Sequence, residues 1–200
     1  KMSKSKGNVV SLDEAVSKFG ADATRMATLY LGPAELDAEW DKDSDKVFAG
    51  PYRFLERVWR MTQARTFNRD WREVVGAQGF APSDVNQKLA RKTHQTIQKV
   101  GGDIERFNLN TAISALMEMA NSLSSWLDAT KNNADDAQTQ AVYSEAVETM
   151  LLLLSPFAPH LSDEMLERLG CDKSAYETSW PVANDDVARE DEITVPVQIN

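Results

Sequence analysis

The chain has 200 residues, 42% apolar and 26% charged, with a formal net charge of −9 at pH 7, so it is a globular protein rather than a disordered one. Its longest unbroken apolar run, Met150–Leu154, is far below the ~20 residues of a membrane-spanning helix. Cys171 is the single cysteine, which excludes an internal disulfide and a cysteine-based metal site and favours a reducing, cytoplasmic location.

The first 45 residues predict a loop followed by short helices. Residues 1–10 are rich in Lys, Ser and Gly and have no apolar period, which is typical of a loop. Ser11 and Glu14 have the spacing of a capping box, which predicts a helix that ends at Gly20. A second helix is expected at about residues 22–31, before Gly32 and Pro33.

From residue 46 onward the apolar residues recur at three and four positions, as on one face of a helix. Gly101 and Gly102 are expected to end one of these helices, and Pro156 and Pro159 to break another. The expected long helices cover residues 46–62, 84–100, 110–127 and 135–154, with a shorter one that ends near residue 169. Residues 193–199 resemble the start of strands. The sequence therefore predicts a mostly all-α fold, an antiparallel helical bundle with a loop-rich front end.

Charge is distributed unevenly along the chain. Residues 51–106 carry eleven basic and six acidic side chains, whereas residues 107–200 carry four basic and sixteen acidic ones. Within the basic third, Arg53, Arg57 and Arg60 share one helix face, and the next long helix carries Lys88, Arg91, Lys92 and Lys99. Two neighbouring helices with such faces would bind phosphates, with little readout of nucleotide sequence. The alternative is a pair of ordinary solvated faces.

The front segment has its own chemistry. Lys1 and Lys4, three residues apart, lie among small hydroxyl residues and close to Gly7. A flexible cationic loop of this kind suits an anion whose charge grows during a reaction, as when a triphosphate loses pyrophosphate. Its spacing is not that of a Walker loop.

Lys1-Met2-Ser3-Lys4-Ser5 is also identical to the signature loop of class I aminoacyl-tRNA synthetases. Further matches, in the right order and over nearly the whole chain, make the sequence resemble the bacterial leucyl-tRNA synthetases. They are Lys6–Val10, Gly20–Asp22 with Arg25, Asp37–Trp40, Tyr52–Trp59, Phe107–Ile113, Leu151–His160 and Ser179–Pro181.

The resemblance implies a role in ATP-dependent formation of leucyl-adenylate and its transfer to leucine tRNA. ATP, in the presence of Mg²⁺, would be contacted by Lys1, Met2, Ser3, Lys4 and Ser5. Lys4, assisted by Lys1, would stabilise the ATP phosphates. Residues 1–10 would be the signature loop, 11–45 a stem-contact region, 46–170 an anticodon-binding-type bundle, and 171–200 a tail toward a further domain. Leucine tRNA, leucine and ATP are the expected partners. Binding to a membrane, to DNA or to a resident metal ion is not expected.

The chain also departs from a complete class I enzyme. His94 is followed by Gln95 and His160 by Leu161, so neither supplies the His-x-Gly-His signature. We therefore expect a C-terminal piece of a larger enzyme, which does not aminoacylate tRNA by itself. Two alternatives stay open: a piece of an isoleucyl- or valyl-tRNA synthetase, and a non-catalytic bundle whose acidic half, residues 107–200, recruits a protein partner.

Overall fold

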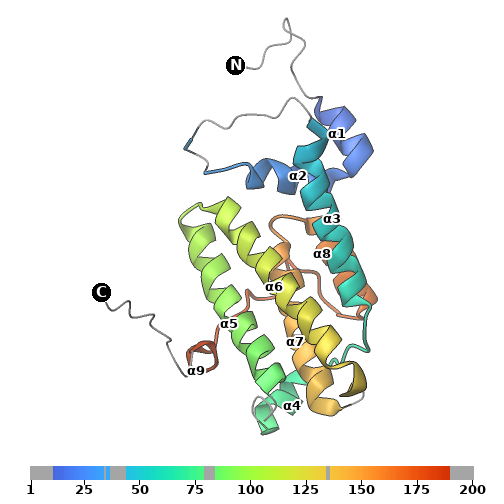
Figure 1. Ribbon diagram of the computed structural model, residues 1–200, viewed down its shortest axis with the longest axis vertical. Coiled ribbons are helices and arrows are strands. Elements are labelled where there is room, and N and C mark those ends of the chain that lie inside the picture. The colour runs from blue at the N-terminus through green and yellow to red at the C-terminus, as the bar shows by residue number, and fades with distance from the viewer. Residues whose placement is uncertain (1–10, 34, 37–43, 79–83, 134–135, 190–200) are drawn as a thin grey trace, which may run out of the picture.

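The computed structural model describes residues 11–33, 35–36, 44–78, 84–133 and 136–189, which contain nine α-helices, one short 3-10 helix and no β-strand (Figure 1). The prediction of a mostly α fold is confirmed. The strand starts expected at 193–199 lie outside the described residues.

Four long helices form an antiparallel bundle. They are α3 (Ser44–Thr62), α5 (Asp84–Glu105), α6 (Leu109–Ala129) and α7 (Ala137–Leu154). Consecutive members run in opposite directions along the long axis of the molecule, with α6 between α3 and α5 on the face shown in Figure 1. The core includes Ile113, Leu116, Tyr143, Met150 and Leu151, all fully buried.

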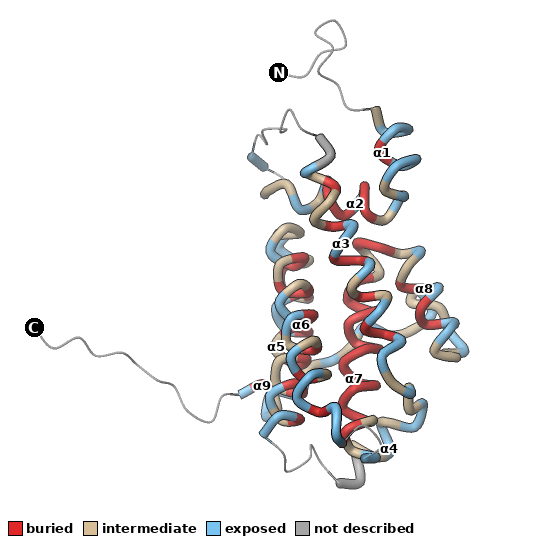
Figure 2. Tube along the Cα trace, turned by 45° about the vertical axis from the view of Figure 1, so that its right-hand side comes forward, coloured by how far each residue is buried: buried red, intermediate tan, exposed pale blue. Residues whose placement is uncertain are grey.

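Helix α7 is the central element of the bundle. Nearly every side chain from Thr139 to Leu154 is buried, and its tube is almost entirely red in Figure 2. A helix that packs on all sides has no polar face, which explains the continuous apolar run at its end. Asp136 caps its first turn by accepting a hydrogen bond from the backbone N–H of Thr139 at 2.8 Å. The buried Tyr143 hydroxyl donates to the carbonyl of Met61 at 2.8 Å, and burial raises the pKa of Tyr143 to about 12.

Helices α1 (Leu12–Phe19) and α2 (Ala21–Tyr30) lie at one end of the bundle and confirm the two short helices expected there (Figure 1). Gly20 joins them with φ 83°, a conformation that glycine adopts without a steric penalty. The capping-box prediction was wrong in one respect, because the Ser11 side chain makes no cap hydrogen bond. The ring of Phe19 stacks on that of Phe48 in α3, with centroids 5.2 Å apart.

The predicted end of α5 at Gly101 and Gly102 was wrong. The helix continues to Glu105, and the chain turns at Phe107, whose φ is +60°. Each interior glycine costs about 1 kcal/mol of helix stability. Burial of Val100, together with the three hydrogen bonds that the buried Asp103 accepts, outweighs that cost. Tertiary packing therefore overrides the local signal here.

Three shorter helices complete the described structure. Helix α8 (Pro159–Arg168) follows the two prolines as expected, whereas α4 (Trp71–Gln78) and α9 (Asp185–Ala188) were not predicted. The segment that carries α9 docks on α5. The backbone N–H of Asn184 donates to His94 Nδ1 at 3.0 Å, and Gln95 donates to the carbonyl of Ala188 at 3.0 Å.

Candidate nucleic-acid interface

The residues predicted to contact ATP, Lys1, Met2, Ser3, Lys4 and Ser5, lie outside the described residues. Their role stays a prediction.

The three arginines of α3 differ in their surroundings. Arg53 and Arg60 are exposed, and the Arg53 Nε donates to the carbonyl of Ala49 in its own helix at 3.1 Å. Arg57 is half-buried and reaches α6, where its guanidinium donates to Asn121 Oδ1 at 2.7 Å and to the carbonyl of Met117 at 3.4 Å. Arg57 therefore joins α3 to α6, and Arg53 and Arg60 leave their positive charge at the surface.

The four cations of α5 are also unequal. Lys88 is exposed and makes no ion pair within the described residues, and Arg91 is half-buried. Lys92 pairs with Glu118 of α6 at 2.8 Å. Lys99 pairs with Asp103 one turn further along its own helix at 2.7 Å. The charges of Lys92 and Lys99 are therefore already balanced by carboxylates.

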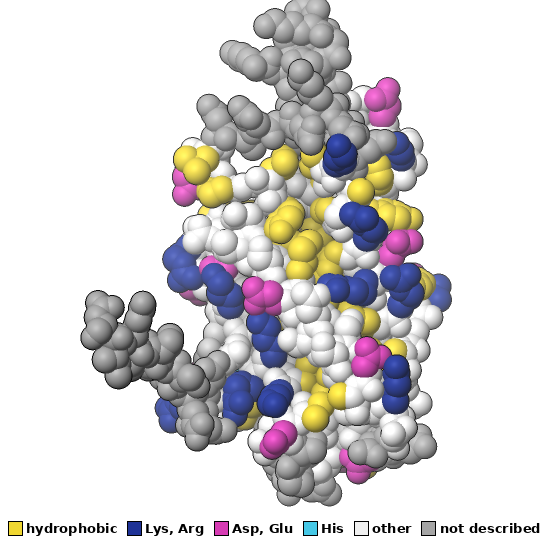
Figure 3. Space-filling view, in the orientation of Figure 1, with side chains coloured by type: hydrophobic (Ala, Val, Ile, Leu, Met, Phe, Trp, Pro, Cys, Tyr) yellow, Lys and Arg dark blue, Asp and Glu magenta, His cyan; other side chains and the backbone are white. Residues whose placement is uncertain are grey.

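The two basic helices are not adjacent on this face of the bundle. Helix α6 lies between α3 and α5, and both Arg57 and Lys92 reach across to it (Figure 1). The helix order along the chain does not reveal this arrangement, because α6 comes after both basic helices. The result is a broad face with cations on both flanks of α6, where dark blue side chains are visible in Figure 3.

A groove follows the contact between α5 and α6, and we call it the α5–α6 groove. It contains two cavities, of about 360 and 400 Å³. The first is lined by Lys92, Gln95, Thr96, Lys99, Thr111, Ser114, Ala115 and Glu118, and the second by Val85, Lys88, Leu89, Asn121, Ser122, Ser125, Trp126 and Ala129. The α5 side of the groove supplies three lysines, and the α6 side supplies hydroxyl and amide groups and the carboxylate of Glu118.

The polar strip on α6 was missed by the sequence analysis. Thr111, Ser114, Asn121 and Ser125 recur at three, four and seven positions and stand at the groove. The same periodicity that reveals an apolar face would have revealed this strip of small polar side chains. Such side chains donate hydrogen bonds to phosphate and sugar oxygens in nucleic-acid complexes. Thr111 and Ser114 already donate to Asp103 and to the carbonyl of Asn110, so the expected donors to RNA are Asn121 and Ser125.

Asp103 organises the end of the groove. Its carboxylate is 1% exposed and accepts hydrogen bonds from Lys99, Thr111 and Arg106 at 2.9, 2.7 and 3.2 Å. Burial alone would raise the pKa of Asp103, but these three hydrogen bonds outweigh it and hold the pKa below its ordinary value. The ionised carboxylate fixes the position of Lys99 beside Thr111.

We expect Asp103→Asn to lower the free energy of unfolding by about 1–2 kcal/mol at neutral pH. Since the pKa of Asp103 is lower in the folded state, its stabilising effect is complete above the unfolded pKa of about 3.9 and is lost as the pH falls through the folded pKa. Urea unfolding of the two proteins should therefore differ at pH ~7, and the difference should shrink as the pH falls below about 3.9. Asp128→Asn, at an exposed carboxylate that pairs with Lys131, is the control and should change little. A difference that persists in acid would contradict the assignment.

Arg65 is a second residue that sequence analysis did not single out. Its guanidinium donates to Thr130 Oγ1 at 2.7 Å and lies over the Trp126 ring, 4.7 Å from the centroid. Burial lowers the pKa of Arg65 from its ordinary value, partly offset by Tyr143. It therefore ties the end of α3 to α6, as Arg57 does nearer the middle.

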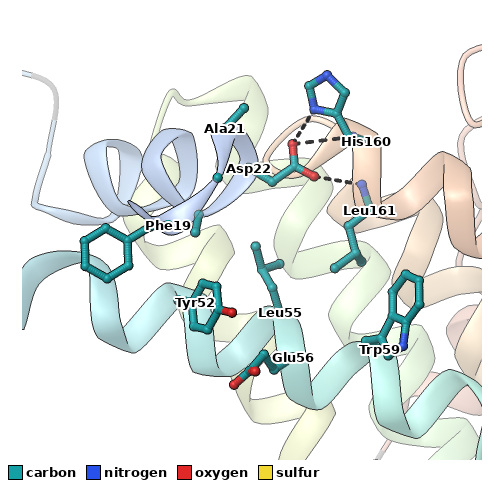
Figure 4. A pocket seen from close by; sticks show the side chains of 11 residues that line it. Phe19, Ala21, Asp22, Tyr52, Leu55, Glu56, Trp59, His160 and Leu161 are labelled. Atoms are coloured by element: carbon teal, nitrogen blue, oxygen red, sulfur yellow. Dashed lines mark hydrogen bonds and ion pairs between the residues drawn. The ribbon is translucent and has the colours of Figure 1, made fainter. Parts of the chain in front are cut away.

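A separate cavity of about 370 Å³ lies between α2, α3 and the start of α8 and is mainly apolar (Figure 4). Phe19, Tyr52, Leu55 and Trp59 line it, and Asp22 and His160 stand at its rim. Within the described part of the chain, no group of three or more His, Cys, Asp or Glu side chains has a metal-binding arrangement. None of the described helices is long and apolar enough to span a membrane.

Comparison with known proteins shows which proteins this chain resembles in sequence and in fold. The leucine–tRNA ligase of Petrotoga mobilis is 41% identical over all of this chain and 23% of its own length. The leucine–tRNA ligase of Geotalea daltonii is 40% identical, again over all of this chain and 23% of its own length. A crystal structure of the ternary complex of Agrobacterium radiobacter K84 agnB2 LeuRS, tRNA and LeuAMS matches with a TM-score of 0.75 and 27% identity, covering 94% of this chain and 23% of that one.

The chain thus spans about a quarter of the length of these relatives. A family described as the anticodon-binding domain of tRNA ligase matches residues 86–200, which include most of α5 and all of α6, α7, α8 and α9. Because the match covers more than half of the chain, and the helical bundle agrees with it, this protein belongs to the anticodon-binding domain family of tRNA ligases.

Proposed function

We propose that the chain is the tRNA-supporting part of a leucine–tRNA ligase, with the α5–α6 groove and the adjoining face of α3 as the contact surface. The observation that carries this proposal is that α6, with its polar strip, lies between α3, which carries the exposed Arg53 and Arg60, and α5, which carries the exposed Lys88 (Figure 1). Exposed cations on both sides of a row of hydroxyl and amide groups suit a phosphate backbone. The similarity to leucine–tRNA ligases over the whole chain favours leucine tRNA and makes an isoleucyl or valyl enzyme the weaker alternative.

The contacts expected here orient RNA and do not read its bases. The groove offers charge and short hydrogen-bond donors but no exposed aromatic platform, since Trp126 is buried beneath it. Base identity is read by groups that reach base edges. We therefore expect this surface to add affinity to tRNA of any sequence and to hold its helical parts in position.

Within a full-length ligase we propose that Lys1 and Lys4, with Met2, Ser3 and Ser5, contact the phosphates of ATP during formation of leucyl-adenylate, in the presence of Mg²⁺. Two lysines three apart can neutralise charge on the departing pyrophosphate. Leucine, and the remainder of the ATP molecule, would bind through parts of that ligase other than this chain. By itself the chain is expected to bind tRNA without charging it.

The test is a titration of leucine tRNA and of an unrelated tRNA with the 200-residue chain over a range of salt concentrations. Counterion release predicts a linear fall of log affinity with log salt, with a slope near −0.9 for each phosphate contact on duplex RNA or DNA, so about three contacts give a slope near −3. Similar slopes for both RNAs are expected. The control is the same titration with an unrelated acidic protein of similar size.

Absence of binding at low salt would overturn the proposal. It would favour the second candidate, a bundle whose acidic residues 107–200 recruit a protein partner, for which the sixteen acidic side chains of that region are the supporting observation. Clear preference for leucine tRNA over the other RNA would support the proposal while placing part of the enzyme's discrimination on this surface.

A further inference from the structure

A further pocket lies where three parts of the chain meet: the segment before α4, helix α7 and the end of α8. It shares no residue with the α5–α6 groove. We call it the Arg69 pocket. Its volume is about 320 Å³, at the lower end of the range of small-ligand sites. It is lined by Phe67, Arg69, Arg72, Glu148, Leu152, Leu166, Gly170, Cys171, Asp172, Lys173 and Thr178.

One cation of this pocket, the exposed Arg69, has no carboxylate partner within the described residues. Its guanidinium lies directly over Gly170, so closely that a Cβ added at Gly170 would be 2.1 Å from Arg69 Nη2. Arg69 can therefore occupy this position only because residue 170 has no side chain.

Gly170 is itself fixed by the end of α8. Its φ is +77°, its N–H donates to the carbonyl of Glu167, and the next N–H, of Cys171, donates to that of Leu166. These two hydrogen bonds form a Schellman motif, in which glycine is the preferred residue. The Gly170 backbone is thus fixed, and the absence of a side chain there leaves the space at the pocket mouth that the Arg69 guanidinium occupies.

The buried carboxylate of the pocket is already neutralised. Glu148 accepts hydrogen bonds from Trp71 Nε1 at 2.7 Å and from Arg72 at 2.6 Å. Arg72 also lies over the Trp71 ring, 4.4 Å from the centroid. The exposed Lys173 adds a further positive charge at the rim, while Asp172 is the one exposed carboxylate of the lining. The mouth therefore retains an excess of positive charge.

The floor of the pocket is apolar. Phe67 is half-buried, and Leu152 and Leu166 are buried. Burial, and then the nearby Glu148, raise the pKa of the Cys171 thiol, so this side chain is neutral and adds no negative charge. A ligand that matches this lining has a flat apolar ring and an anionic group next to it.

We propose that the Arg69 pocket binds a nucleotide, with its phosphate on Arg69 and Lys173 and its base against Phe67, Leu152 and Leu166. An arginine fork donates hydrogen bonds to two phosphate oxygens at once. The nucleotide is either a free 5′-mononucleotide or an unstacked nucleotide of an RNA strand, since both carry the same phosphate and ring. This inference does not depend on the α5–α6 groove, so the two can fail separately.

The experiment is an NMR titration of the ¹⁵N-labelled 200-residue chain with four probes: AMP, adenosine, inorganic phosphate and the single-stranded trinucleotide ApApA. We expect AMP or ApApA to shift the amide signals of residues 69–72 and 170–173 saturably at millimolar concentration. Adenosine and phosphate, which each lack one half of the ligand, should bind about tenfold more weakly. Tighter binding of AMP than of ApApA identifies the free nucleotide as the source, and the reverse order identifies RNA.

Two variants test the role of Arg69. Arg69→Gln removes the charge and should weaken binding about tenfold, whereas Arg69→Lys should restore part of it. Gly170→Ala keeps the charge but displaces the guanidinium, and should also weaken binding about tenfold. Arg189→Gln, which removes an exposed arginine on the segment that docks on α5, is the control and should leave binding within about twofold.

Three results would overturn the proposal. They are no saturable shift with either AMP or ApApA, equal affinity for inorganic phosphate and AMP, and equal losses in Arg69→Gln and Arg189→Gln. Because Gly170→Ala strains a positive φ, its fold is checked by circular dichroism. If it is unfolded, the Arg69→Gln and Arg69→Lys pair decides the question.

Discussion

Replacing Arg53, Arg60 and Lys88 together by glutamine is expected to lower the affinity for tRNA by roughly two orders of magnitude at ~0.1 M salt. It should also reduce the magnitude of the salt slope by about three units, one for each lost phosphate contact. These are the predicted interface cations that the structure leaves exposed and without a carboxylate partner within the described residues. Filter binding or fluorescence anisotropy at several salt concentrations measures both quantities.

The matched control is the triple variant Arg57→Gln, Lys92→Gln and Lys99→Gln. It removes the same formal charge, so it weakens long-range attraction to RNA equally. These three side chains already bind Asn121, Glu118 and Asp103, respectively. We therefore expect a change of about one unit or less in the salt slope, together with a loss of stability that the first triple does not show.

Comparison of the two triples separates contact from overall charge. Equal losses of affinity and slope would mean that RNA responds only to net charge, which contradicts a defined contact surface on α3, α5 and α6. A larger loss of affinity in the control triple (Arg57→Gln, Lys92→Gln and Lys99→Gln) would mean that Lys92 and Lys99 leave their carboxylates when RNA binds. That result would relocate the contact surface to the centre of the α5–α6 groove.

Asp22→Ala is expected to lower the free energy of unfolding by about 2–3 kcal/mol. The Asp22 carboxylate, 12% exposed, lies at the start of α8 (Figure 4). One oxygen accepts from the Leu161 N–H at 2.7 Å, and the other accepts from the His160 N–H at 3.4 Å and lies 2.8 Å from His160 Nδ1. Loss of this carboxylate removes the cap of α8 and its tie to α2.

Thermal or urea unfolding monitored by circular dichroism measures the effect, and the melting temperature should fall by about 6 °C. Asp22→Asn keeps an acceptor for one N–H and should lose about half as much. Glu56→Ala is the control, because Glu56 is an exposed carboxylate that lines the same cavity. A change as small in Asp22→Ala as in Glu56→Ala would show that α8 is held by its apolar contacts alone.

Much of the fold was predictable from the sequence, because most of its helices have local signals. Apolar residues recur at helical spacing in α3, α5 and α6, and Pro159 and Gly170 mark the two ends of α8. The elements that were missed have weak local signals. Helix α4 is short, and α9 has four residues, held on α5 by contacts with residues about ninety positions away, such as Gln95 with Ala188.

The extension of α5 through Gly101 and Gly102 shows the limit of local signals. Two glycines predict a helix end, since each favours other conformations. Asp103 binds Lys99 on one side and Thr111 on the other, so the helix and the turn after it are fixed by a buried carboxylate. A local preference of about 1 kcal/mol per residue is smaller than the contacts that oppose it.

The sequence by itself determined the family to which the chain belongs, its helical bundle and the identity of its basic side chains. Only the tertiary structure decided which of those charges remain available to RNA. The partner of Arg57 is 64 residues away along the chain and that of Lys92 is 26 residues away. Pairs at such separations depend on which helices become neighbours, and helix α6 lies between α3 and α5 because its apolar face packs in the core. Spacing along one helix carries no information about that arrangement.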